Sequence, residues 1–190
     1  MSETGGVDFF PADGPLPELR VDVGPIVLRP FEQRDLSLIQ EASADDLIPH
    51  ITTVPSTYSE QEGVAFLARQ ASRLVTRAGW SLVIESKQTG AAVGSVGLWI
   101  SNLHRGRCEM GYWIAKSGRR AGHAAAALTA LSDWAFDHLP VHRLTLYIEP
   151  WNVGSIKTAE RSGFVNEATL AAWELIDGEA KDMLCFARTR

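Results

Sequence analysis

A short basic glycine loop joins a strand-like segment to an alanine-rich helix, and this junction constrains the fold more than any other part of the sequence. The strand-like run covers residues 109–114, the loop residues 119–124 and the helical run residues 124–139. A strand that turns directly into a helix aims unpaired backbone N–H groups and the positive end of the helix dipole at one point. Such a point binds phosphate, and Gly122 removes the Cβ that would hold an anion away. The junction therefore predicts a domain of strands and helices with an anion site where this helix begins.

Two other phosphate-binding loops are excluded by their residues. The segment lacks the Gly-Lys-Ser/Thr ending of a P-loop, and it lacks a Gly-x-Gly-x-x-Gly followed by an acidic residue, as a dinucleotide site requires. An ordinary strand-to-helix turn that contains a glycine stays open on this segment alone, because such turns are common. The flanking segments must distinguish the two interpretations.

Composition and charge fit one globular domain with an anionic ligand. The chain has 190 residues, of which 45% are hydrophobic and 22% charged, and its net charge is -5. This acidic balance argues against a nucleic-acid partner, which would require a basic face. Around the glycine loop, however, bases exceed acids, which favours an anion there. Within residues 104–123 the only acid is Glu109, and the bases are Arg105, Arg107, Lys116, Arg119 and Arg120.

Several classes of protein are excluded by what the sequence lacks. Residues 1–8 have neither the basic nor the apolar region of a signal peptide, and no apolar stretch approaches the length of a membrane span. The two cysteines, Cys108 and Cys185, have no Cys-x-x-Cys spacing, and the histidines are scattered, so neither a disulfide nor a metal site is expected. We therefore expect a cytoplasmic protein with no membrane partner.

Hydrophobic periodicity divides the chain into a loose, flexible arm over residues 1–20 and one domain over residues 21–190. Ser59 and Glu62 form a capping box at the start of one helix, and residues 49–58 read as a polar loop. The expected helices cover residues 35–44, 59–79 and 124–139 and a short segment that ends at Gly163. The expected strands cover residues 19–29 (a pair broken at Gly24), 80–85, 91–100, 108–114, 144–148, 164–174 and 183–187.

A second motif follows the strand that ends at Ile148. Asn152 suits the N-cap of a short helix, Ser155 lies one turn further on, and Gly163 suits the position just after the helix. Helix capping alone is one interpretation of these residues.

Together these motifs resemble the GNAT superfamily of N-acetyltransferases. The order Arg-x-x-Gly-x-Ala at 119–124, after Gly-Tyr-Trp-Ile at 111–114, is similar to its acyl-CoA pyrophosphate loop, and the Asn152 motif is similar to its second acetyl-CoA contact. Residues 27–30 with Asp35, and residues 176–182, are similar in particular to ribosomal-protein alanine/serine N-acetyltransferases. The likeness covers residue 26 to the end. It implies one GNAT-type domain of the α/β (α+β) class, in which about four helices flank a mixed, mostly antiparallel sheet.

The resemblance also implies acetyl-CoA as co-substrate. The backbone of the strand would orient the thioester, the glycine loop would hold the pyrophosphate, and Asn152 would hold the pantetheine arm. The implied binding residues are Trp113, Ile114, Arg119, Arg120, Ala121, Gly122, His123, Ala124, Asn152 and Ser155.

Acetyl transfer from a thioester to an amine needs a neutral amine, a polarised carbonyl and a proton for the departing thiolate. Glu109 is the first candidate for the base, because its strand should face the acyl group. A salt bridge to a neighbouring arginine, Arg105 or Arg107, is the competing interpretation. Tyr147, with Glu149 on the same face of the next strand, is held in reserve, and Ser155 is the candidate acid.

The acceptor is less constrained than the donor. The resemblance favours a protein N-terminal amine, while a small amine such as an antibiotic or polyamine, and a non-catalytic acyl-CoA-binding module, stay open. The oligomeric state is also open between a monomer and a homodimer. Among the tryptophans, Trp80, Trp99 and Trp134 suit core positions, whereas Trp113, Trp151 and Trp173 lie close enough to the motifs to line an acceptor pocket.

Overall fold

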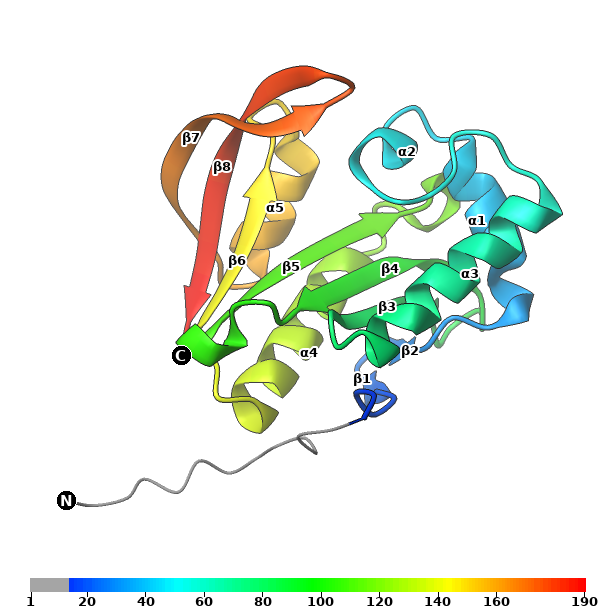
Figure 1. Ribbon diagram of the computed structural model, residues 1–190, viewed down its shortest axis with the longest axis horizontal. Coiled ribbons are helices and arrows are strands. Elements are labelled where there is room, and N and C mark those ends of the chain that lie inside the picture. Colours follow the sequence, from blue (N-terminus) through cyan, green and yellow to red (C-terminus); the bar gives the residue numbers. More distant parts are fainter. Residues whose placement is uncertain (1–13) are drawn as a thin grey trace.

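An open sheet with helices on both faces forms the described part of the chain, residues 14–190 of a computed structural model (Figure 1). Its eight strands follow the order β1-β2-β3-β4-β5-β6-β8-β7. Neighbouring strands run antiparallel throughout, except that β5 and β6 run parallel. The mixed, mostly antiparallel sheet implied by the resemblance is therefore confirmed.

The strands and helices lie close to where periodicity placed them. The strands are β1 (Val21–Val23), β2 (Ile26–Arg29), β3 (Gly79–Ser86), β4 (Ala92–Trp99), β5 (Arg107–Ile114), β6 (Arg143–Ile148), β7 (Val165–Ile176) and β8 (Glu179–Thr189). The helices are α1 (Leu36–Ser43), α2 (Ile48–Ile51), α3 (Glu60–Val75), α4 (His123–His138) and α5 (Val153–Arg161).

The short helix α2 is an addition to the four helices that the sequence predicts. It overlaps the start of the segment expected as a loop, and the Asp45 carboxylate accepts hydrogen bonds from the backbone N–H groups of Leu47 and Ile48 at its beginning. These bonds satisfy donors that the first turn of a helix leaves free. A proline, Pro49, in that first turn also favours helical geometry.

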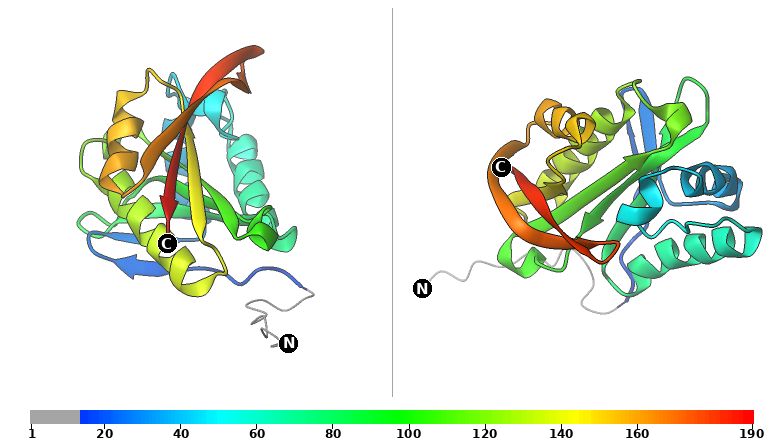
Figure 2. Two further views of the ribbon diagram at one scale, coloured as in Figure 1. Left: turned by 90° about the vertical axis from the view of Figure 1, so that its left-hand side faces the viewer. Right: turned by 90° about the horizontal axis from the view of Figure 1, so that it is seen from above.

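The two faces of the sheet are covered by different helices. In the view from above, α4 and α5 lie on one side of the sheet and α1, α2 and α3 on the other (Figure 2). The larger core lies under α4, where Leu128 and Leu131 are fully buried against the strands. A smaller core under α1 includes Ile39 and Phe66. The alanine-rich sequence of α4 lets this helix lie close to the sheet.

The arm expected over residues 1–20 falls largely outside the described residues, which begin at Gly14. From Leu16 onward the chain packs against the domain, since Leu16 and Leu19 are both buried. The backbone N–H of Leu16 donates to the carbonyl of Leu74, and the indole N–H of Trp80 donates to the carbonyl of Pro17. The packed domain thus begins before residue 21.

A buried ion pair ties the start of α1 to the end of β2. Arg29 is 1% exposed, and its Nη1 and Nη2 donate to the two carboxylate oxygens of Asp35 at 2.7 and 2.8 Å. Its Nε donates to Glu85 on β3 at 2.7 Å. These hydrogen bonds, with Asp35 first, raise the pKa of Arg29 despite its burial. Residues 27–30 and Asp35 carry part of the family resemblance. The ion pair gives these residues a structural role.

Replacement of Asp35 by alanine should lower the free energy of unfolding by about 3–5 kcal/mol, because it leaves a buried guanidinium short of a partner. Urea unfolding followed by circular dichroism measures this loss. The exposed pair of Asp22 with Lys87 gives a matched control, since Asp22→Ala removes a surface ion pair that contributes less than about 1 kcal/mol. Equal losses in the two variants would show that Arg29 is not held as described.

Candidate active site

The parallel strands β5 and β6 pair over a short stretch and then separate. Their register pairs are Arg107 with Arg143, Cys108 with Leu144, and Glu109 with Thr145. Beyond these pairs β5 continues beside β4, and β6 continues beside β8, so each strand keeps only its outer partner. Figure 1 shows the two strands opening as a V. The inner edges of both strands therefore offer backbone N–H and C=O groups to a ligand.

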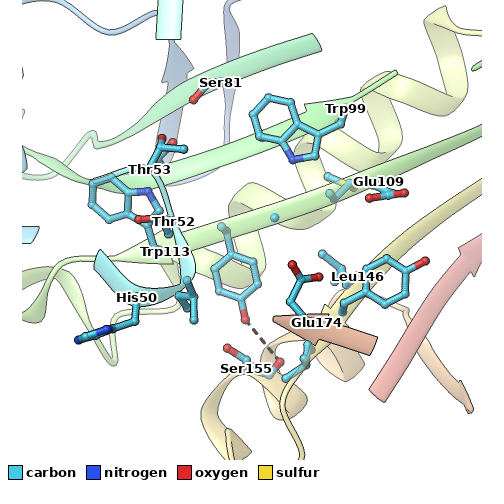
Figure 3. Close-up of a pocket in the computed structure, with 18 of the residues that line it drawn as sticks. His50, Thr52, Thr53, Ser81, Trp99, Glu109, Trp113, Leu146, Ser155 and Glu174 are labelled. Atoms are coloured by element: carbon cyan, nitrogen blue, oxygen red, sulfur yellow. Dashed lines mark hydrogen bonds between the residues drawn. The ribbon is translucent and has the colours of Figure 1, made fainter. Parts of the chain in front are cut away.

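Tyr112 spans the gap between the separated strands. Its hydroxyl donates to the backbone carbonyl of Ser155 in α5 at 3.4 Å, shown as a dashed line in Figure 3. Burial raises the pKa of Tyr112, so the hydroxyl keeps its proton as a donor. The contact fixes the first turn of α5 relative to β5.

A cleft of about 470 Å³ opens between the separated strands and extends under α2 and α3. A volume of this size suits a small molecule or a short peptide segment. Of the residues that the sequence predicts for the site, the cleft brings together Glu109, Trp113, Tyr147, Asn152 and Ser155. Ile114 and residues 119–124 do not line it.

Glu109 lies at the point where the two strands part. It belongs to the last register pair of β5 and β6, and its antiparallel partner on β4 is Trp99. The salt bridge to Arg105 or Arg107 is absent, since Glu109 takes part in none of the ion pairs formed among residues 14–190. Its half-buried carboxylate faces the cleft (Figure 3) and is available to a ligand.

Tyr147 lines the cleft from β6 and is better suited to donate a proton than to accept one. Burial raises the pKa of Tyr147, and the nearby charge of Glu109 raises it further. The Trp173 ring lies 5.5 Å from the Tyr147 ring, which helps to hold it in place. The neighbouring carboxylate of Glu149 accepts a hydrogen bond from the Trp151 indole at 2.8 Å.

Asn152 and Ser155 form the cap of α5. The Asn152 Oδ1 accepts from the backbone N–H of Ser155 at 3.1 Å, so the predicted N-cap is confirmed. The Ser155 side chain lies beside the cleft and also interacts with the Tyr112 hydroxyl. From this position the Ser155 hydroxyl can donate a proton to a ligand.

The glycine loop ends where α4 begins, and its backbone is shaped for an anion. Gly122 is the N-cap with φ of 79°, and no side chain caps the helix. Ala126 donates to the Gly122 carbonyl, whereas the N–H groups of His123 and Ala124 have no partner among the described residues. A Cβ on Gly122 would meet nothing within 4 Å, so space lies open before these donors. The start of α4 thus fits a phosphate group.

The side chain of Arg119 already has partners within the protein. Its guanidinium pairs with Asp45 at the end of α1 and donates through Nε to the carbonyl of Ile114 at 3.0 Å. Burial disfavours the charged form of Asp45, but hydrogen bonds from backbone N–H groups and from Arg119 outweigh it and lower the pKa. Arg119 therefore shapes the loop, and the Nδ1 of His123 lies 3.2 Å from the carbonyl oxygen of Gly118 in the same loop.

Residues that the sequence did not single out complete the cleft. Trp99 faces the cleft from β4 (Figure 3), so its assignment to the core is wrong, whereas Trp80 is buried as expected. Helix α3 contributes Gln70 and Arg73, and β7 contributes Glu174. No local pattern marks these residues, because segments distant in the sequence bring them together.

The β7–β8 hairpin closes one side of the cleft. Asp177 in its turn lies 2.7 Å from His50 in α2, so the hairpin and the helix meet across the opening. In Figure 1 the tip of the hairpin reaches toward α2. A ligand in the cleft is thus covered by segments from both halves of the chain.

None of the helices between residues 14 and 190 is both long and apolar enough to cross a membrane. In the same part of the chain, no three His, Cys, Asp or Glu side chains are grouped so that they could hold a metal ion.

Strand β5, the glycine loop and helix α4 follow one another in the order that the resemblance to the GNAT superfamily implies. The family model for the acetyltransferase (GNAT) domain matches residues 26–165, and the chain belongs to this family. Among curated proteins, it is 30% identical over 101 residues to the uncharacterized N-acetyltransferase p20 of Bacillus licheniformis, an alignment that covers 53% of this chain. The aligned segments span 57% and 51% of two such relatives, about half of their length.

Solved structures of the same fold include enzymes named for different acceptors. RimJ of Mycobacterium smegmatis, solved in complex with CoA-disulfide, superposes with a TM-score of 0.74 at 24% identity, over 92% of this chain and 86% of that one. A spermidine N-acetyltransferase SpeG chimera from Vibrio cholerae and hSSAT gives a TM-score of 0.71 at 21% identity, over 87% and 96%. At these identities the likeness concerns the fold.

The Trp99 side chain depends on a glycine beneath it, which gives a test of the cleft geometry. A Cβ on Gly97 would lie 2.4 Å from the Trp99 ring, so Gly97→Ala should displace the indole and lower the free energy of unfolding by about 1–3 kcal/mol. Near-ultraviolet circular dichroism would detect the changed surroundings of the ring. Gly154→Ala is the control, because that Cβ has room in α5. An unchanged tryptophan spectrum in Gly97→Ala would contradict the packing.

Proposed function

We propose that this protein transfers an acetyl group from acetyl-CoA to the N-terminal amine of a protein or peptide. The observation that carries the proposal is the unpaired Glu109 carboxylate at the point where β5 and β6 separate, with the Ser155 hydroxyl on the same cleft. A proton acceptor and a proton donor thus face one space, as acyl transfer to an amine requires.

Acetyl-CoA, the acetyl donor, suits two places in the chain. The free N–H groups where α4 begins suit the phosphates, and Gly122 leaves room for them. The inner edge of β5 near Trp113 and Ile114, which pairs with no strand there, suits the amide groups of an extended arm. Acetyl-CoA supplies the activated acyl group as its thioester.

The chain's own residues then have distinct tasks. Glu109 takes the proton of the acceptor amine, directly or through water. An N-terminal amine with a pKa of about 8 is roughly a tenth neutral at pH 7, whereas a lysine amine at about 10.4 needs some 4–5 kcal/mol to lose its proton, so a modest base suffices for the former. Ser155 donates a proton to the departing thiolate, and Tyr147 is the reserve donor.

The acceptor proposal rests on the branch resemblance and on the form of the cleft. Backbone groups along the inner strand edges suit the backbone of a peptide. A second candidate is a small polyamine, which is favoured by the carboxylates of Glu109, Glu149 and Glu174 around one cleft.

Replacement of Glu109 by glutamine should lower kcat by about 10²–10⁴-fold while the affinity for CoA stays within a few-fold, because the amide keeps the shape but cannot take a proton. Thioester consumption with a panel of amines and peptides measures turnover, and calorimetry measures affinity for CoA. Glu160→Gln on the exposed side of α5 is the control. Unchanged turnover would move the base to Glu149, or would show that no side chain acts as the base. If the unmodified protein bound CoA but turned over no amine, a non-catalytic acyl-CoA-binding module would replace the proposed activity.

Replacement of Gly122 by valine should weaken CoA binding by about tenfold or more, since a branched side chain would stand before the free N–H groups and remove at least one charge-assisted hydrogen bond. Gly24→Val is a matched control: Gly24 also has a positive φ and an open Cβ position, but it lies in the β1–β2 turn. Backbone strain should then be common to both variants, whereas the loss of CoA affinity should occur in Gly122→Val alone. Full affinity in folded Gly122→Val would place the phosphates elsewhere.

A further inference from the structure

One cation in the cleft has no anionic partner among residues 14–190. Arg73, near the end of α3, is half-buried and lines the cleft, and it takes part in none of the ion pairs among the described residues. A buried charge without a counter-ion is costly, which is why such groups usually have partners. Burial, and then the charge of the neighbouring Arg69, lowers the pKa of Arg73, in accord with the missing counter-ion. A guanidinium nevertheless stays charged at neutral pH.

The side chain of Arg73 is held in place from two sides. Its guanidinium carbon lies 4.4 Å from the centroid of the Trp99 ring, in a cation–π contact. Its Nε donates to the Oε1 of Gln70 at 3.0 Å. Gln70 is only 4% exposed, and its Nε2 donates in turn to the carbonyl of Phe66 at 3.3 Å. A buried amide therefore orients the guanidinium. The Nη1 and Nη2 atoms of Arg73 have no hydrogen-bond partner among residues 14–190.

The surface beneath Arg73 is also specialised. Gly97 and Gly111 are register partners on β4 and β5, and the Trp99 indole lies over this pair, with ideal Cβ positions 2.4 and 4.0 Å from its atoms. The indole Nε1 of Trp99 has no hydrogen-bond partner in the described part of the chain. Two kinds of free donor, a planar guanidinium and an indole N–H, thus face one cleft. Such a fork matches the two oxygens of a carboxylate.

The position of this donor pair relative to Glu109 sets the separation between the amine and the carboxylate of the acceptor. Trp99 and Glu109 face each other directly across β4 and β5, and Arg73 lies on Trp99, yet Arg73 and Glu109 form no ion pair. Register partners in antiparallel strands have Cα atoms about 4.5–5.5 Å apart, and one extended residue spans about 3.3–3.6 Å. An amine beside Glu109 and a carboxylate on Arg73 are therefore separated by one or two residues.

We propose that Arg73 and the Trp99 indole N–H bind a carboxylate of the acceptor, so that the preferred acceptor is a peptide N-terminus with an acidic side chain at its second or third position. This proposal rests on the proposed function and names the acceptor of the same site. Gln70 is a positioning residue, since it acts through Arg73. The carboxylates of Glu109 and Glu174 face the amine, so the acceptor is bound in one orientation.

The test compares acceptor peptides that differ at one position. The peptides carry a C-terminal amide, serine at the first position, and glutamate, glutamine or lysine at the second or third position. The value of kcat/KM for the glutamate peptide should exceed that for the glutamine peptide by about tenfold or more, and the lysine peptide should be poorest. Arg73→Gln should reduce the ratio to within about twofold of one, and Arg73→Glu should invert it in favour of lysine.

Controls separate this preference from general charge effects. Arg69→Gln removes a charge one turn away on the same helix, where the side chain is exposed and lies outside the cleft lining, and it should retain the preference. A free amino acid tests whether a carboxylate beside the amine suffices; a preference for it over the acidic peptides would overturn the peptide assignment. Equal kcat/KM values for the glutamate and glutamine peptides, or a preference for lysine, would overturn the carboxylate site.

Failure of the two proposals can be distinguished. Turnover without an acidic preference rejects the carboxylate site alone. Absence of turnover with all amines rejects the proposed activity, and the carboxylate site is then judged by equilibrium binding of the same peptides to CoA-loaded protein, followed by tryptophan fluorescence. Tighter binding of the glutamate peptides, lost in Arg73→Gln, supports the site, and equal binding of all peptides rejects it.

Discussion

The site depends on the limited pairing of two parallel strands. Strands β5 and β6 share only the register pairs that end at Glu109 and Thr145, and beyond them each strand is held on its outer side alone. Continued pairing would close the sheet and consume the backbone groups that now face the gap. The antiparallel neighbours β4 and β8 keep the separated strands ordered, so the opening is compatible with a stable sheet. Glu109 lies where the strands part, and α5 and α4 begin at the ends of the two arms.

The two faces of the sheet are divided between stability and ligand binding. The face under α4 carries large apolar side chains such as Leu98, Leu144 and Met110, which form the main core. On the opposite face, where the cleft lies, the central strands carry small and polar residues together with Trp99 and Trp113. Gly97 leaves room for the Trp99 ring, which a Cβ at this position would displace, and a Cβ on its register partner Gly111 would lie at ordinary contact distance from the same ring. Alternation along a strand thus makes one face a core and the other a binding surface.

The parts of the site that sequence reasoning located are local in the chain. The glycine loop before α4 and the Asn152 cap of α5 each arise from a few consecutive residues whose backbone preferences are known. The position of Glu109 at the end of the paired stretch depends on how far β5 and β6 stay together, which no periodicity encodes. The sequence suits Trp99 to a core position, yet its register partner on β5 is Glu109, which faces the cleft. The pairing of Arg119 with Asp45 likewise joins segments far apart in sequence.

A half-buried Arg73 guanidinium without a counter-ion costs free energy of desolvation, and this cost argues for a ligand. The Trp99 contact and the Gln70 hydrogen bond return part of the solvation that the guanidinium loses, but two of its nitrogens have no partner in residues 14–190. The buried Arg29, in contrast, has partners within the protein, since it donates hydrogen bonds to the carboxylates of Asp35 and Glu85. The difference between these two arginines is that only Arg73 faces the cleft. A structural arginine is satisfied by its own chain, whereas one held ready for an acceptor carboxylate keeps its donors free until the acceptor binds.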